Sequence, residues 1–217
     1  MTEPADGNRM LARVASILDA VDGSAASASE LARRAGLSVS TAHRIAVSMV
    51  EYGFLRRTAN GDFGLGHRFV RSVMATAALP VLSQLRDETG ETAQLWIRRA
   101  DERVCLVTVD SKQELKVSMA AGSRLPLPAG SSGRILSGDE EALSEIAVHG
   151  WVDSMAKRTS GQASVSAPVF LEGQLVASVC LALPLSRVTS SPGLEFGASV
   201  VAAAATISTL LDKAQTA

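Results

Sequence analysis

Apolar and polar residues follow helical spacing through the first third of this chain and extended spacing through much of the rest. The pattern predicts three helices in the first third: Met10 to Val21, a second ending at Gly36, and a third that starts after Ser38. The apolar positions that define them are Leu11, Val14, Leu18, Val21, Leu31, Ala32, Ala35, Ala42, Ile45, Ala46 and Met49. Gly36 permits a sharp turn, and the Ser38 hydroxyl is a suitable N-cap for the third helix.

A β-hairpin is predicted directly after the third helix. Its strands are Phe54 to Arg57 and Asp62 to Leu65, and Asn60-Gly61 is the dipeptide typical of a type I′ turn. Two short helices at a steep angle followed by such a hairpin form a winged helix-turn-helix. Binding to double-stranded DNA is therefore the leading hypothesis.

The third helix would place a polar face in the major groove, and the hairpin would bring arginines to the phosphates. The residues predicted to bind DNA are Ser38, Ser40, Thr41, His43, Arg44, Ser48, Arg56 and Arg57. The alternatives are a solvated face in an unrelated helical domain and ordinary surface arginines. From Ser29 to Gly66, five arginines stand against three acids, a net charge of +2. This weak positive charge predicts that the protein binds its operator as a homodimer or a tetramer.

The remaining pattern predicts a second domain. His67 to Ala78 has helical spacing, and Pro80 would open a new helix at its first position. We therefore expect a DNA-binding domain over 1–66, a linker helix over 67–79 and a second domain over 80–217, with one continuous domain as the alternative.

Extended segments dominate this second domain. Predicted strands are Ala93 to Arg99, Val104 to Asp110, Leu115 to Met119, Ala163 to Phe170 and Leu175 to Leu183, the last two joined by a Glu172-Gly173 turn. Predicted helices are Glu140 to His149 and Leu194 to Lys213. The expected fold class is α+β, with an N-terminal winged helix-turn-helix and a C-terminal domain built on a central antiparallel sheet.

Composition narrows the location of the protein. No run approaches the roughly 20 apolar residues of a membrane span, and MTEPADGNRM lacks the pattern of a signal peptide. We expect a cytoplasmic protein with no membrane partner.

The first third resembles the IclR family of bacterial transcriptional regulators. The matching residues are LARRAGLSVSTAHRIAVSM at Leu31 to Met49, Tyr52 to Leu55, and the FGLG at Phe63 to Gly66. The most family-specific cluster is Ser40-Thr41 with His43-Arg44. The resemblance implies that these four residues contact DNA.

The resemblance extends over the second half, through Pro80 to Leu85, TGETAQL at Thr89 to Leu95, GSRLPLPAGSSGRIL at Gly122 to Leu136, and SAPVF at Ser166 to Phe170. It implies a GAF-like domain for effector binding and oligomerisation. GETAQL, AGSSGRIL and GQASVSAPV are closest to the NdgR-like branch, which implies control of amino-acid biosynthesis, including leucine genes.

The effector positions implied by the resemblance are Leu125, Ser131, Ser132, Ser154, Ser164, Cys180 and Ala182. The Gly130 to Gly133 turn that opens a helix is either a receptor for a carboxylate, as in an amino acid or a keto acid, or a plain capped loop. The chain departs from the family pattern in its short segment before Gly150-Trp151. It also carries Ser154 where an acid is frequent and Ala182 where a serine is usual.

Two other function classes remain as alternatives. A small hydrolase would need a site that no motif reveals, because the Gly130 turn is not a nucleophile elbow and His43, His67 and His149 lack metal-ligand spacing. A redox-responsive regulator would use Cys105 or Cys180, although their apolar neighbours favour buried free thiols. We predict no catalytic activity, no cofactor and no metal.

Overall fold

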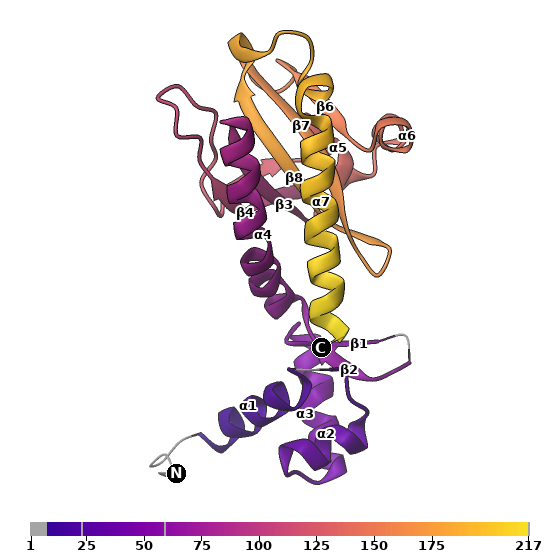
Figure 1. Cartoon of the computed structure of the whole chain (residues 1–217). Coiled ribbons are helices and arrows are strands. Elements are labelled where there is room, and N and C mark those ends of the chain that lie inside the picture. The colour runs from indigo at the N-terminus through magenta and orange to yellow at the C-terminus, as the bar shows by residue number, and fades with distance from the viewer. Residues whose placement is uncertain (1–7, 23, 59, 217) are drawn as a thin grey trace. The chain divides into compact units, whose positions relative to one another are not determined.

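The computed structural model describes residues 8–22, 24–58 and 60–216, and the chain forms two compact units that divide within two helices, after Val73 and after Asp212 (Figure 1). The elements of the first unit are α1 (Arg9–Val21), α2 (Ala28–Ala35), α3 (Val39–Glu51), β1 (Leu55–Arg57) and β2 (Phe63–Leu65). Helix α4 (His67–Thr89) contains the first of these divisions.

Capping residues define the helix-turn-helix as the sequence predicts. The Ser27 hydroxyl accepts from the Glu30 N–H at the start of α2, and Gly36 ends that helix in the left-handed conformation at φ 65°. The Ser38 hydroxyl accepts from the Thr41 N–H and starts α3. These contacts stop α2 from continuing and give α3 a defined beginning.

One apolar core holds the first unit together. Its buried residues are Ile17, Ala20, Val21, Ala26, Leu31, Ala32, Ala42, Ile45, Ala46, Met49, Leu55 and Phe63. The four apolar positions predicted for α3 are all buried, which confirms the stripe, and Leu37 packs against this core at the corner between the helices.

The hairpin after α3 is a wing, and a third extended segment pairs with it at Ala26. β1 pairs antiparallel with β2, and Phe63 also exchanges both backbone hydrogen bonds with Ala26. The predicted type I′ turn at Asn60-Gly61 is wrong, because the Gly61 N–H donates to the Thr58 carbonyl and the turn closes one residue earlier. Gly61 follows that turn at φ 82°, a conformation that glycine adopts without strain.

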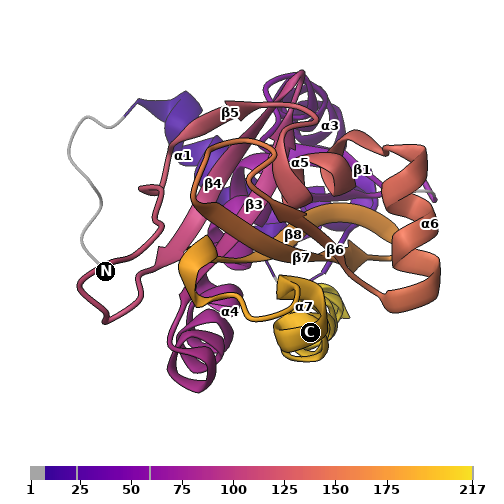
Figure 2. The ribbon, with the colours of Figure 1, turned by 90° about the horizontal axis from the view of Figure 1, so that it is seen from above.

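The second unit is a sheet with helices on both faces (Figure 2). Its strands are β3 (Thr92–Arg99), β4 (Glu102–Val109), β5 (Arg124–Pro126), β6 (Val152–Met155), β7 (Gln162–Leu171) and β8 (Gln174–Pro184). They run antiparallel in the order β5-β4-β3-β8-β7-β6. Its other elements are α5 (Gly130–Ser137), α6 (Glu140–His149), the short 3₁₀ helix η1 (Leu185–Arg187) and α7 (Pro192–Thr216).

Alternation along the strands gives the sheet two different faces. α4 and α7 lie on one face and α5 on the other (Figure 2). Buried apolar residues alternate on the first face at Ala93, Leu95, Val165, Val179 and Leu181. The positions between them carry Gln94, Ser164, Ser166 and Cys180, so the second face is polar and suited to a ligand.

α4 continues through Pro80, where the sequence predicts a new helix. A proline inside a helix costs about 3 kcal/mol. Pro80 is exposed, however, and the buried stripe formed by Met74, Ala78, Leu82 and Leu85 keeps its phase across it, which offsets the cost. The expected linker helix is therefore the first part of a longer one, and the domain limits at 66 and 80 stay a prediction.

Three details of the predicted sheet differ from the structure. Leu115 to Met119 is not a strand, and β5 and β6 are strands that the sequence analysis did not predict; β5 pairs with β4 only at Glu102 to Val104. The carbonyls of Leu115 and Met119 accept hydrogen bonds from side chains instead. The α6 helix and the Glu172-Gly173 turn agree with the prediction, and both turn residues have positive φ.

Pro192–Ala214, within α7, is long and apolar enough to cross a membrane by length and composition alone, contrary to our expectation. It packs in the unit through buried residues one and two turns apart: Val200, Ala203, Ala204, Ile207 and Leu211. A core helix passes the same test, so this finding is weak support for a membrane span.

Candidate nucleic-acid interface and effector pocket

The exposed face of α3 carries the residues predicted to contact DNA. Ser40, His43, Arg44 and Ser48 are exposed and Thr41 is half-buried, opposite the stripe that packs into the core. Within the described part of the chain, Arg44 makes no hydrogen bond or ion pair. A free guanidinium on the outward face of a rigid helix can reach a base edge or a phosphate.

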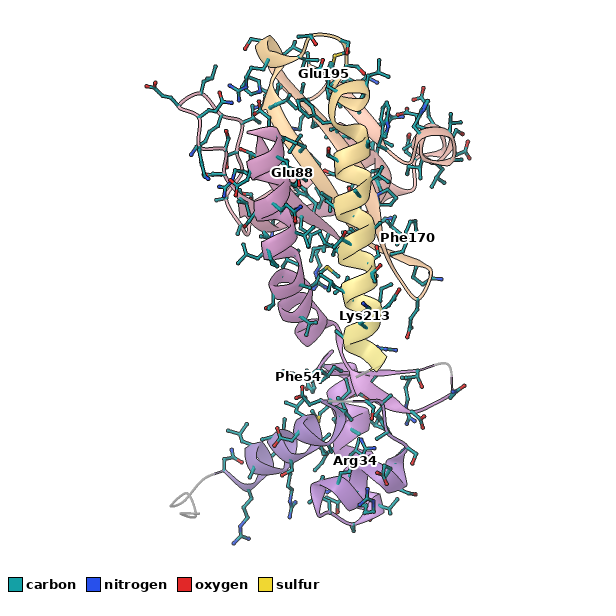
Figure 3. All side chains as sticks on the ribbon, in the orientation of Figure 1. Arg34, Phe54, Glu88, Phe170, Glu195 and Lys213 are labelled. Atoms are coloured by element: carbon teal, nitrogen blue, oxygen red, sulfur yellow. The ribbon has the colours of Figure 1, made fainter. Side chains whose placement is uncertain are left out.

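The five arginines between Ser29 and Gly66 divide into two on α2 and three on α3 and the wing. The Glu30 carboxylate binds both Arg33, at 2.6 Å, and Arg34, at 2.7 Å, and these hydrogen bonds lower the pKa of Glu30 to about 2. Arg34 also donates to the Ala20 carbonyl and ties α2 to α1 (Figure 3). Two of the five arginines thus share one carboxylate, which offsets one of their two charges. The other three are Arg44, Arg56 and Arg57.

Hydroxyl groups gather at the N-terminus of α3. The Ser38 hydroxyl donates to Thr41 Oγ1 at 2.8 Å while it accepts from the Thr41 N–H, and Ser40 Oγ lies 3.3 Å from it. Ser38 therefore positions the start of the helix. Ser40 projects from its first turn.

The Arg57 side chain joins the wing to α3. Its guanidinium lies 3.8 Å above the Phe63 ring, donates to the Gly61 carbonyl at 2.5 Å, and lies 3.3 Å from His43 Nε2. His43 also meets the Phe63 ring edge-on at 5.9 Å. Arg57 is exposed and Arg56 half-buried, so both remain within reach of a phosphate.

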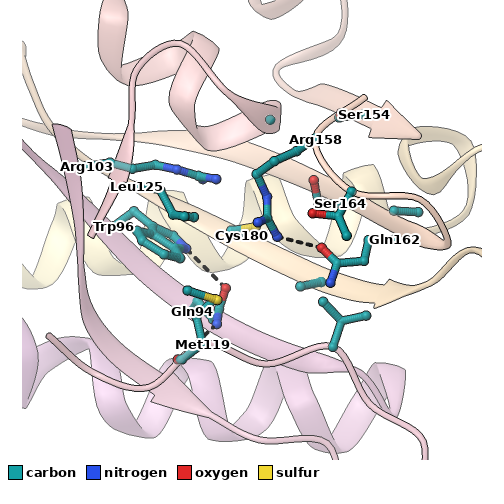
Figure 4. A pocket seen from close by; sticks show the side chains of 15 residues that line it. Gln94, Trp96, Arg103, Met119, Leu125, Ser154, Arg158, Gln162, Ser164 and Cys180 are labelled. Atoms are coloured by element: carbon teal, nitrogen blue, oxygen red, sulfur yellow. Dashed lines mark hydrogen bonds between the residues drawn. The ribbon is translucent and has the colours of Figure 1, made fainter. Parts of the chain in front are cut away.

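A pocket with a cavity volume of about 40 Å³ opens on the polar face of the sheet (Figure 4). The strand register sets Ser154, Ser164, Ala182 and Thr92 in one row, and Ser166, Cys180 and Gln94 in the next. Trp96 Nε1 donates to Gln94 Oε1 at 3.1 Å, and Gln94 in turn donates to the Met119 carbonyl. Ligand pockets are commonly 300–1,000 Å³, so this one has room for a few water molecules and must widen to admit a ligand.

Five of the seven predicted effector residues line this pocket: Leu125, Ser154, Ser164, Cys180 and Ala182. Ser131 and Ser132 are buried beneath it and already bonded. Ser131 shares hydrogen bonds with Ser164 and Ser166, and Ser132 accepts from Arg103. Gly130 does line the pocket, and no side chain caps the N-terminus of α5 that follows it.

The sequence analysis missed two arginines in the lining, Arg103 and Arg158. Arg103 could have been found, because it alternates with Val104 and so shares the face of β4 that carries Cys105. No such signal marks Arg158, which lies in a polar loop and donates to Gln162 Oε1 at 2.5 Å. Figure 4 shows both side chains reaching toward Cys180.

Both cysteines lie in a core cluster with Trp96 and Leu136, and their surroundings do not favour a redox-responsive regulator. Cys105 and Cys180 are free and buried, and burial raises the pKa of the Cys105 thiol to about 11. At neutral pH this thiol is protonated and inert, whereas redox sensors use accessible thiolates.

Comparison with known families agrees with this architecture. The sequence profile of the IclR helix-turn-helix domain matches residues 10–59, and that of the bacterial transcriptional regulator IclR C-terminal domain matches residues 68–141. The chain belongs to the IclR family. The resemblance inferred from the sequence is confirmed, while the NdgR-like branch stays a prediction.

Two curated relatives match most of the chain, and a third matches about half of it. The transcriptional repressor IclR of Escherichia coli (strain K12) is 26% identical and covers 81% of this chain and 79% of its own. BhcR of Paracoccus denitrificans (strain Pd 1222) is 25% identical over 95% of this chain and 88% of its own. KipR of Bacillus subtilis (strain 168) is 32% identical, but that match spans only about half of each protein, 49% and 46%.

Solved IclR structures share the fold. An IclR-family regulator from Rhodococcus sp. has a TM-score of 0.62 at 25% identity and covers 99% of both chains. An IclR homolog from Microbacterium hydrocarbonoxydans, solved with 4-hydroxybenzoate, has a TM-score of 0.56 at 26% identity over 94% of this chain and 99% of its own. The curated relatives are transcriptional regulators and repressors, so this chain is a DNA-binding transcriptional regulator rather than an enzyme.

Proposed function

We propose that this regulator reads its operator with α3 in the major groove. Ser40, Thr41, His43, Arg44 and Ser48 would meet base edges and nearby phosphates, with Ser38 at the helix start. Arg56 and Arg57 would bind the backbone beside the groove. The observation that carries the proposal is the division of α3 into a fully buried apolar stripe and an exposed polar face with an unpaired arginine.

We further propose that a small carboxylate of the amino-acid or keto-acid type binds the pocket in the second unit and changes operator affinity. The proposal is supported by the two arginines in the lining and by the complex of an IclR homolog with 4-hydroxybenzoate, itself a carboxylate. The seven implied effector positions would then act in two ways. Five would touch the ligand, while Ser131 and Ser132 would hold α5 and Arg103 in place.

A cytoplasmic homodimer or tetramer acting as a repressor completes the proposal. Symmetric dimers read two half-sites, which compensates for the weak positive charge of one copy. Control of amino-acid biosynthesis, as in the NdgR-like branch, is the regulatory role we propose.

Selection of genomic fragments by the full chain, with and without candidate carboxylates, tests this function. We expect one enriched sequence motif with two half-sites, and a changed yield of those fragments when the correct acid is present. Fluorescence titration should then show much tighter binding to that motif than to a scrambled duplex. Equal and weak binding to both would overturn operator recognition.

A further inference from the structure

His43 and Arg57 meet where α3 packs against the wing, and their contact fixes the state of the imidazole ring. Arg57 Nη2 lies 3.3 Å from His43 Nε2. A guanidinium can only donate hydrogen bonds, so Nε2 accepts this one and carries no hydrogen. The ring in this arrangement is therefore neutral, and its hydrogen is on Nδ1.

Contacts with the wing also fix the orientation of both side chains. The Arg57 guanidinium lies 3.8 Å above the Phe63 ring and donates to the Gly61 carbonyl. The His43 ring meets Phe63 edge-on, with ring centroids 5.9 Å apart and 78° between the planes. Phe63 belongs to the buried core of the first unit and gives both contacts a rigid base. The imidazole is thus held in one orientation although His43 is exposed.

The Nδ1–H group of His43 is a donor that the protein leaves unused. Within residues 8–22, 24–58 and 60–216, His43 makes no hydrogen bond other than the one with Arg57. The side chains one turn away on α3 include no acid that could take this hydrogen. They are Val39, Ser40, Ala46 and Val47. An oriented donor therefore stands next to Arg44 on the helix proposed to enter the major groove.

The chemistry of the major groove determines what this donor can read. N7 is an acceptor that both guanine and adenine expose there, whereas cytosine presents a donor. A hydrogen on Nδ1 finds a partner at N7. In the opposite tautomer Nδ1 carries a lone pair, and two acceptors facing each other form no hydrogen bond. The contact with Arg57 therefore decides whether His43 can bind a purine through Nδ1.

We propose that Arg57 is a positioning residue that holds His43 in its neutral Nδ1–H form, and that this hydrogen binds N7 of one purine in the operator. The proposal rests on the proposed placement of α3 in the major groove and adds a base contact to it. It also separates the two wing arginines. Both supply charge to the phosphates, but Arg57 acts in addition on sequence preference, through His43.

Nitrogen NMR of the full chain carrying ¹⁵N-labelled histidine tests the ring state without DNA. The two neutral tautomers give different shifts at Nδ1 and Nε2, and the His43 signals are those that disappear in His43→Ala. We expect His43 in the Nδ1–H form at pH 8, and a change towards the Nε2–H form in Arg57→Met. A hydrogen on Nε2 in the unmodified chain would overturn the proposal.

Purine analogues test the base contact. 7-Deazaguanine and 7-deazaadenine lack the N7 acceptor but keep Watson–Crick pairing. The probe is the motif recovered by genomic selection, with each purine replaced in turn. We expect one position at which the analogue weakens binding by about three- to tenfold, the effect of one lost hydrogen bond. His43→Ala and Arg57→Met should both remove the difference between analogue and natural base at that position.

Arg56→Met is the matched control, because it removes the same charge from the neighbouring position on β1. It should weaken binding to the natural and analogue duplexes by the same factor and so retain the difference between them. A retained difference in His43→Ala or Arg57→Met, or no sensitive purine at all, would overturn the proposal. Since His43 is exposed, His43→Ala tests the base contact even if Arg57→Met fails to fold.

Failure of the proposed function gives a different result. If the unmodified chain binds the selected and scrambled duplexes equally weakly, operator reading by α3 fails and the purine contact fails with it. The NMR measurement then still decides whether Arg57 sets the tautomer of His43. If the selected duplex binds tightly but no analogue weakens it, the placement of α3 stands and only the purine contact is wrong.

Discussion

Arg57 and Arg103 stack on aromatic rings, one in each unit, in opposite surroundings. In the wing, exposed Arg57 covers Phe63 and also contacts Gly61 and His43. On the sheet, buried Arg103 covers Trp96 and keeps an unpartnered Nε. Water compensates the first charge, so that stack serves to join two elements. No acidic side chain among the described residues pairs with the second, so that stack holds an uncompensated charge beside the pocket.

Removal of the Phe63 ring should have the largest effect, a loss of stability of the first unit. Phe63 is fully buried, and truncation of such a ring to alanine costs about 3–5 kcal/mol of unfolding free energy. Circular dichroism in urea should therefore show early loss of helix in Phe63→Ala. Trp96 and Trp151 both lie in the second unit, so their fluorescence should report an unchanged transition.

Phe63→Leu is the matched control, because it keeps most of the apolar contact and should cost much less. A tryptophan transition that shifts together with the helical signal in Phe63→Ala would show that the two units do not unfold independently.

The Cys105 thiol reports whether water is excluded from the stack of Arg103 on Trp96, because Cys105 shares a core cluster with Trp96. Its folded pKa of about 11 exceeds the ordinary 9.0, so the folded thiol keeps its proton where the unfolded thiol loses it. This term leaves stability constant below pH 9, and stability falls by about 2–3 kcal/mol as pH rises from 9 to 11.

Urea titrations from pH 7 to 11 check this effect by comparing the chain with Cys105→Ala. The variant should lose less stability above pH 9. Identical slopes would mean that water reaches the thiol, and the contrast between the two stacks would weaken.

Arg44 offers an exposed arginine without a stack. If it reads a guanine edge, Arg44→Ala should weaken operator binding by about 1–3 kcal/mol and relax the preference at one base pair. Arg33→Ala, on α2 and paired with Glu30, serves as the control and should change binding little. If only the salt dependence changes and sequence preference is retained, Arg44 contacts a phosphate.

The smallest expected effect comes from Arg57→Lys, which keeps the charge and loses the planar stack. An exposed cation–π contact contributes about 0.5–1 kcal/mol, so operator binding should weaken by a similar amount. Arg56→Lys is the companion variant. Unchanged affinity in Arg57→Lys would show that Arg57 acts through its charge alone.

Local patterns predicted the first unit well and the pocket less well. The α3 stripe and the Ser38 cap depend on residues within a few positions, so spacing alone identifies them. Leu115 to Met119 has strand-forming residues but is held by side chains from distant parts of the chain, and Pro80 lies in a helix held by distant contacts. The environment of Arg103 depends on the register of β3, β4 and β8, which no short window of sequence contains.

The segment from Leu115 to Met119 covers part of the cavity without belonging to the sheet. Val117 and Met119 line the cavity, yet the segment is fastened to the unit by side chains of Thr108, Gln94 and Arg187 rather than by a strand ladder. Displacing it breaks a few side-chain contacts and leaves the sheet intact. We therefore expect amide exchange within the second unit to be fast in this stretch.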